Sequence, residues 1–121
     1  MSKKVIFLLD NDKTFLDLYT KLLQTKGWQV FATDNLFLLI KYAQTTTPEW
    51  IFIDQNYTQN REKEIINIIN KGIPFNQINY AVMSPYISSK NIPTRNHVEF
   101  VYKPHILEKI KQITENCCNH S

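Results

Sequence analysis

The sequence has few cysteines and no long apolar run. Only two of its 121 residues are cysteines, Cys117 and Cys118, and they are adjacent. Neighbouring cysteines rarely form a disulfide, and neither has a spacing typical of a zinc site, so the sequence predicts neither kind of cross-link. The longest apolar run near the start covers residues 5–9, which is too short for a signal-peptide core or a membrane span. We therefore expect a cytoplasmic protein that makes no membrane contact.

The sequence also lacks a large excess of charge of one sign. Its formal net charge is +3, and no basic block follows Lys3 and Lys4, so we expect no direct contact with nucleic acid. With 43% hydrophobic and 21% charged residues, the composition is that of a globular domain that can bury a core without disulfides. There are no repeats or linkers. We predict one domain over residues 1–115 and a disordered tail over residues 116–121.

What the sequence does contain is a regular alternation of apolar segments. Five short segments are typical of strands. Two of them, residues 5–9 and 50–53, are continuous apolar runs of the kind that is buried on both faces of a parallel sheet, and each is followed by an aspartate. Between the five segments, apolar residues recur at helical spacing. The predicted strands cover residues 5–9, 28–32, 50–53, 78–83 and 98–102, and the predicted helices cover residues 15–23, 35–43, 65–69 and 106–113.

The segment between the fourth and fifth strands has only a weak helical signal. Pro85 and Pro93, together with several serines and asparagines, interrupt the pattern over residues 85–96. We therefore expect a fourth helix that is short or distorted. Strands alternating with helices indicate a doubly wound α/β fold, with a five-stranded parallel sheet covered on both faces.

Polar side chains stand where the predicted strands end. In an open α/β sheet, ligands bind outside the carboxyl ends of the strands, so residues from distant parts of the sequence should converge at one edge. The residues at those ends are Asp10, Asn11 and Asp12, then Asp54, Gln55 and Asn56, then Ser84, and last Lys103.

This set of residues suits a divalent cation and a phosphoryl group. Magnesium prefers hard oxygen ligands and retains several waters, so one or two carboxylates are sufficient to hold it. Asp54 could attack a phosphoryl donor if the metal and Lys103 neutralise the charge on the transferred oxygens. Ser84 could donate a hydrogen bond to the same group.

At these residues the chain resembles the receiver domains of two-component response regulators, over about residues 4–113. The segments that carry the resemblance are VIFLLDND, PEWIFIDQN, YAVMS and EFVYKP. The resemblance implies a flavodoxin-like sheet of strand order 2-1-3-4-5. It also implies phosphorylation by a sensor histidine kinase, a phosphotransfer protein or a small phosphodonor in a magnesium-dependent reaction. With no output domain attached, such a module would act through contacts with a downstream protein that the sequence does not name.

The resemblance assigns a role to individual residues. Asp54 resembles the phospho-acceptor, and Asp10 resembles the first residue of the acidic pair that holds the metal. Asn56 would offer its backbone carbonyl to the metal. Ser84 resembles the switch hydroxyl, Phe100 the aromatic switch and Lys103 the invariant lysine. Lys103–Pro104 resembles a step that is often a cis bond in the family.

Two positions depart from the family pattern. Asn11 stands where the second acid of the pair is usual, which removes one negative charge and should weaken Mg²⁺ binding; Asn11 itself or Asp12 would complete the site. Pro85 follows Ser84 and has no N–H to offer a phosphoryl group. The loop QNYTQNREKE that follows Asp54 also lacks the usual proline and glycine.

These departures leave alternatives to a phospho-accepting module. One is a pseudo-receiver, a binding module that keeps the fold and works without phosphate. Another is a haloacid-dehalogenase-like phosphatase, because residues 10–14 fit the motif DxDxT, with Asp10 as nucleophile and Asp12 as general acid/base. That reading leaves Asp54 without a role. We therefore expect a signalling module rather than a turnover enzyme; dimerisation through the last helix stays open.

Overall fold

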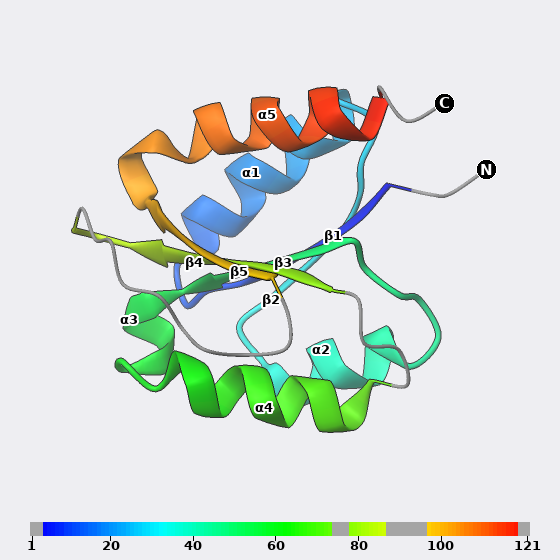
Figure 1. Cartoon of the computed structure of the whole chain (residues 1–121). Helices are drawn as coiled ribbons and strands as arrows, with labels where there is room; N and C mark the ends of the chain where they lie inside the picture. The colour runs from blue at the N-terminus through cyan, green and yellow to red at the C-terminus, as the bar shows by residue number, and fades with distance from the viewer. Residues whose placement is uncertain (1–3, 74–77, 87–96, 119–121) are drawn as a thin grey trace.

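The chain folds into one parallel sheet whose faces are covered by helices. The computed structural model describes residues 4–73, 78–86 and 97–118. The sheet has the strand order β2-β1-β3-β4-β5, and all four pairings are parallel, which confirms the predicted fold class (Figure 1). The strands are β1 (Val5–Leu9), β2 (Gln29–Thr33), β3 (Trp50–Asp54), β4 (Asn79–Ser84) and β5 (His97–Tyr102).

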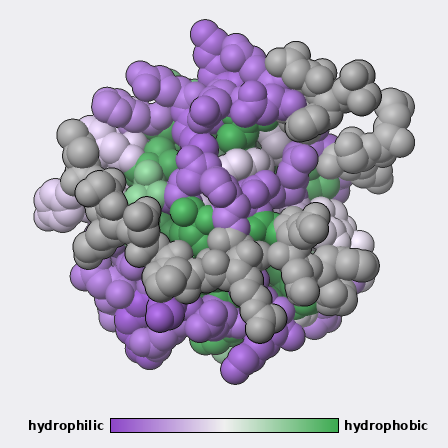
Figure 2. Space-filling model, viewed as in Figure 1, coloured by the Kyte–Doolittle hydropathy of each residue, from purple (hydrophilic) through white to green (hydrophobic). Residues whose placement is uncertain are grey.

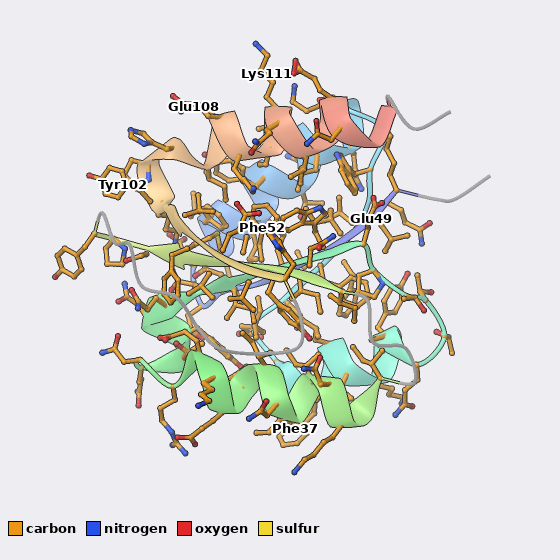
Figure 3. All side chains as sticks on the ribbon, viewed as in Figure 1. Phe37, Glu49, Phe52, Tyr102, Glu108 and Lys111 are labelled. Atoms are coloured by element: carbon orange, nitrogen blue, oxygen red, sulfur yellow. The ribbon has the colours of Figure 1, made fainter. Side chains whose placement is uncertain are left out.

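Two of the three inner strands, β1 and β3, are buried along their whole length. Every residue of β1 and β3 is buried, which is why these strands appear in the sequence as unbroken apolar runs. Side chains alternate between the two faces. In β1, Phe7 belongs to the core on one face, whereas Ile6 and Leu8 belong to the core on the other. Phe52, labelled in Figure 3, lies at the sheet in the middle of the molecule.

The helices form two layers, one on each face of the sheet (Figure 1). α1 (Lys13–Thr25) and α5 (Ile106–Cys118) cover one face. α2 (Leu36–Ala43), α3 (Gln55–Thr58) and α4 (Glu62–Gly72) cover the other. Most of the outer surface in the view of Figure 2 is hydrophilic. None of the helices in the described part of the chain is long and apolar enough to cross a membrane.

Both glycines stand where a side chain would be unfavourable. Gly27 has a φ of 90° immediately after the C-cap of α1, a conformation that favours glycine. At Gly72 the reason is space, because a Cβ would come within 2.5 Å of Cγ2 of Ile40. Gly72 therefore lets the C-terminal ends of α2 and α4 approach closely.

The structure differs from the sequence-based expectations at two helices, α3 and α5. The short helix α3 was not predicted; Asp54 caps it. α5 continues to Cys118, so the helix includes the first residues of the predicted tail. The extension is tied to the domain, since Trp28 Nε1 donates to Thr114 Oγ1 at 2.8 Å. Residues 119–121 lie outside the described part of the chain.

The Lys103–Pro104 bond is trans, a point on which the family resemblance left both forms open. These residues open the 3-10 turn Lys103–His105 that leads directly into α5. Proline is favoured in the first turn of a helix, where its missing N–H would have no helical partner. The predicted short fourth helix falls almost wholly on residues 87–96, which lie outside the described part of the chain.

Candidate functional site

The carboxyl ends of the strands bring four of the predicted polar residues to one edge of the sheet. Asp54 and Ser84 are the last residues of β3 and β4, and Asp10 and Lys103 directly follow β1 and β5. Asp10, Asp54 and Ser84 are only 1%, 3% and 2% exposed. A carboxylate buried this far needs compensating partners.

Lys103 is the partner that the two aspartates share. Its Nζ donates to Asp10 Oδ2 at 2.8 Å and to Asp54 Oδ1 at 3.0 Å. The ammonium also lies 4.4 Å from the centre of the Phe15 ring, a favourable position for a cation over an aromatic face. Phe15 comes from the first turn of α1, so three strand ends and one helix hold the lysine in place.

The pKa values of this group reflect burial and the shared ammonium. Burial raises the pKa of Asp10, and the hydrogen bonds from Lys103 and from the Asp12 N–H offset that effect only in part. Burial alone would lower the pKa of Lys103, but its hydrogen bonds to Asp10 and Asp54 outweigh burial, so its pKa is raised. The lysine therefore stays charged, and two carboxylates share one positive charge.

Each aspartate uses its second oxygen to accept from the backbone. Asp10 Oδ1 accepts from the Asp12 N–H at 3.0 Å, and Asp54 Oδ2 accepts from the Tyr57 N–H at 3.2 Å. Asp54 is thus the N-cap of α3. Both carboxylates are held in fixed orientations, with one oxygen on the lysine and the other on an N–H.

The two predicted switch residues have different surroundings. Ser84 Oγ accepts from the Tyr86 N–H at 3.1 Å, so its side chain closes a small turn around Pro85. Phe100 is half-buried on β5 and packs against the core that faces α2 and α4. Among the described residues, the recorded contacts do not join Ser84 or Phe100 directly to Lys103.

Few side-chain or backbone oxygens near the two aspartates could act as metal ligands. Among the described residues there is no group of three or more acidic, histidine or cysteine side chains that could hold a metal. Asn11 and Asn56 are exposed; the Asn56 carbonyl accepts from the Gln59 N–H at 3.3 Å and has a second lone pair free for another partner. Two carboxylates with carbonyl or amide oxygens, and water for the rest, suit Mg²⁺.

Asp12 has a different task. It is exposed, and its Oδ1 accepts from the Phe15 N–H at 3.2 Å, which makes it the N-cap of α1. A capping carboxylate of this kind explains why an aspartate follows the strand by two positions. Within the described part of the chain, Lys103 forms ion pairs with Asp10 and Asp54 and not with Asp12.

Sequence reasoning missed Phe15 and the Tyr57 N–H as parts of the site. Phe15 begins the predicted helix 15–23, and its helical spacing gives no sign of a contact with Lys103. An aspartate directly before Gln55–Thr58 is a signal for an N-cap, but a single turn carries no periodicity to support it.

Comparisons with known proteins agree with this geometry at the level of the fold. No protein-family model matches the sequence, and no curated protein matches it. A response regulator from Thermotoga maritima has a TM-score of 0.67 at 16% identity, over 94% of this chain and 99% of its own. The beryllofluoride-activated NtrC receiver domain has a TM-score of 0.72 at 13% identity, over 99% and 98%.

A third solved structure carries bound groups. It is a response regulator from Burkholderia pseudomallei with a phosphorylated aspartic acid, a calcium ion and citrate, and it has a TM-score of 0.63 at 16% identity. The match covers 94% of this chain and 70% of that one. Together these similarities show that this chain has the fold of response-regulator receiver domains.

Proposed function

We propose that this chain is a receiver module that accepts a phosphoryl group on Asp54 and signals through contacts with other proteins. The observation that carries the proposal is the position of the Lys103 ammonium, which lies within 3.0 Å of both Asp10 and Asp54 at the carboxyl edge of the sheet. One lysine faces two buried carboxyl groups here and carries a single positive charge. Surplus buried carboxylates at a ligand-binding edge are what a cation site requires.

Asp54 is the nucleophile in this proposal. One of its oxygens forms a bond to phosphorus while the bond from phosphorus to the donor breaks, and the donor leaves as a carboxylate or as the imidazole of a phosphohistidine. Lys103 then has one carboxylate fewer to neutralise and can pair with an oxygen of the transferred group. The Ser84 oxygen accepts from the Tyr86 N–H, and the hydroxyl still has its own proton. Ser84 can therefore donate to the phosphoryl group if its hydroxyl turns towards it.

Asp10, Asp54 and the Asn56 carbonyl would hold the divalent cation, with Asn11 as an additional amide ligand. The cation, when bound, supplies positive charge that lowers the cost of bringing the donor's phosphate to two carboxylates. Asp10 contributes a carboxyl group towards the cation, and the hydrogen bond from Lys103 favours its ionised form against burial, which raises the pKa of Asp10. With one acid fewer than the family pattern, we expect weak Mg²⁺ binding.

The partners that follow from this function are a sensor histidine kinase or phosphotransfer protein upstream and an unidentified protein downstream. Phe100 would report on the site through the core of the α2 and α4 layer. We propose no role for nucleic acid or membrane. The site of action would be the cytoplasm, where such phosphodonors occur.

A pseudo-receiver is the second candidate, and one observation favours it. Every oxygen of Asp10 and Asp54 already has a hydrogen-bond partner, so the site is complete without a cation or phosphate. In that case the module would bind its partner independently of phosphorylation. The dehalogenase-like phosphatase is less well supported, because its general acid/base Asp12 is occupied in capping α1.

Intact-mass measurement separates these candidates. The wild type, Asp54→Ala and Asp10→Ala are incubated with Mg²⁺ and an acyl phosphate, beside a receiver domain known to be labelled. We expect one added phosphoryl group in the wild type and none in Asp54→Ala. Labelling that persists in Asp54→Ala but disappears in Asp10→Ala would point to the phosphatase chemistry. No labelling of the wild type, with the control labelled, would favour the pseudo-receiver.

A further inference from the structure

The turn that follows Asp54 is held at both ends by side chains. At its start, Asp54 Oδ2 accepts from the Tyr57 N–H. At its end, the Thr58 hydroxyl lies 2.8 Å from the Gln55 carbonyl and 3.1 Å from Glu62 Oε1. The hydroxyl has one proton, so these two acceptors share it.

Thr58 and Glu62 are buried, unlike most polar residues of this loop. Thr58 is 4% exposed and Glu62 is 8% exposed, although Glu62 is the first residue of α4. A buried carboxylate so close to the surface is costly unless it has a hydrogen-bonding task. In the described part of the chain, the Glu62 side chain has one hydrogen-bond partner, the Thr58 hydroxyl. This pair therefore joins the turn α3 to the helix α4.

Two residues in the link between α3 and α4 have an unfavourable backbone conformation. Gln59 and Asn60 have φ values of 51° and 65°, in the left-handed region that residues other than glycine adopt at a cost. The Arg61 N–H closes this link by donating to the Thr58 carbonyl at 2.9 Å. Such strain persists only where neighbouring contacts hold it, and the contacts here are those of Thr58.

We propose that Thr58 and Glu62 are positioning residues that hold Asp54 in its lysine-paired orientation through the turn α3. The Thr58–Glu62 pair keeps the turn formed, the formed turn presents the Tyr57 N–H, and that N–H fixes Asp54 Oδ2. A phosphoryl group or cation that takes this oxygen must compete with the cap. The meaning of this arrangement for signalling rests on the proposed function, but the positioning itself does not.

The turn also connects Asp54 to an exposed surface. Tyr57, Thr58 and Gln59 line an open groove together with Phe37 of α2 and Ile68 of α4. Phe37 is 77% exposed and points away from the sheet in Figure 3. Release of the cap would therefore change the shape of a surface between α2 and α4.

The first test measures the turn in the unmodified protein and needs no phosphorylation. Backbone amide hydrogen exchange at Tyr57 is compared in the wild type, Thr58→Val and Thr58→Ser. Valine has the shape of threonine without the hydroxyl, whereas serine keeps it. We expect exchange at Tyr57 to be about fivefold faster in Thr58→Val and close to wild type in Thr58→Ser. Glu62→Ala should resemble Thr58→Val, and Glu62→Gln, which keeps an acceptor oxygen, should retain protection.

The second test measures competition at Asp54 with beryllofluoride and Mg²⁺ as the probe. We expect Thr58→Val to bind the probe about fivefold more tightly than the wild type, because less of the turn must be displaced. Unchanged exchange at Tyr57 in Thr58→Val and Glu62→Ala would overturn the proposal, as would probe binding that weakens in step with thermal stability. If no variant binds the probe, the proposed phospho-acceptor function fails, while the exchange result still decides the positioning role.

Discussion

Two lysines in this molecule have similar surroundings but differ in the number and burial of the carboxylates that they bind. Lys103 contacts carboxylates and lies 4.4 Å from the Phe15 ring centre; Lys109 contacts a carboxylate and lies 4.9 Å from the ring centre of Trp50. Lys103 serves two almost fully buried aspartates. Lys109 donates to both oxygens of Glu99, whose side chain is 36% exposed, at 2.7 Å, and also to the neutral amide of Gln112 at 3.3 Å.

The difference lies in the balance of charge. At Glu99 one carboxylate faces Lys109 and also His97, at 2.6 Å, so no negative charge is left over. Burial alone would raise the pKa of Glu99, but the hydrogen bonds from Lys109 and His97 outweigh it and the pKa is lowered. At Asp10 burial prevails and the pKa is raised. An ion pair alone therefore does not mark a site; a buried surplus of carboxylate oxygens at the strand ends does.

Removal of each lysine should give the largest contrast. We expect Lys103→Met to lower the free energy of unfolding by about 2 kcal/mol at pH 7, because two buried carboxylates lose their shared cation. Lys109→Met should cost about 1 kcal/mol or less, since Glu99 stays partly hydrated. Urea unfolding of both variants measures this difference. Equal losses would show that the two clusters are equivalent structural ion pairs.

The same charge surplus predicts how the site responds to an added acid. Asn11→Asp restores the second member of the acidic pair, and we expect Mg²⁺ to bind about tenfold more tightly, which corresponds to about 1.4 kcal/mol, a small fraction of the interaction of close unit charges. Calorimetric titration with Mg²⁺ measures the change. Asn56→Asp is the matched control, because Asn56 is proposed to act through its backbone carbonyl. An equal gain in both variants would indicate a general charge effect instead of a ligand at position 11.

Much of this arrangement could be predicted from the sequence, for a physical reason. Strands buried on both faces leave an unmistakable apolar run, as at residues 50–53, and the parallel order then sends Asp10, Asp54 and Lys103 to one edge. The contacts that the sequence did not reveal are those that depend on a single turn or on distant partners. Four residues after Asp54 are too few to show a helical period, and the hydrogen bond between Trp28 and Thr114 of α5 joins residues that are far apart in the sequence.

The smallest expected effect is the pH dependence of the Glu99 cluster. The pKa of Glu99 is lowered in the folded state, so its stabilisation is fully present above its unfolded value of 4.5 and is lost as the pH falls through the folded value. Asp10 has the opposite sign, because its raised pKa costs stability at neutral pH, and that cost disappears as the pH falls towards 3.8. We expect Glu99→Gln to be about 0.5 kcal/mol less stable than the wild type at pH 7.

That difference should shrink as the pH falls through the folded pKa of Glu99, because the protonated glutamate resembles glutamine. Urea unfolding of the two proteins at pH 7, 5 and 3 gives the comparison directly, and Asp10 contributes equally to both. A constant difference across this range would mean that Glu99 stabilises the fold by packing instead of by charge. The contrast with the Lys103 site would then lie between a packing contact at Glu99 and a charged cluster at Asp10 and Asp54.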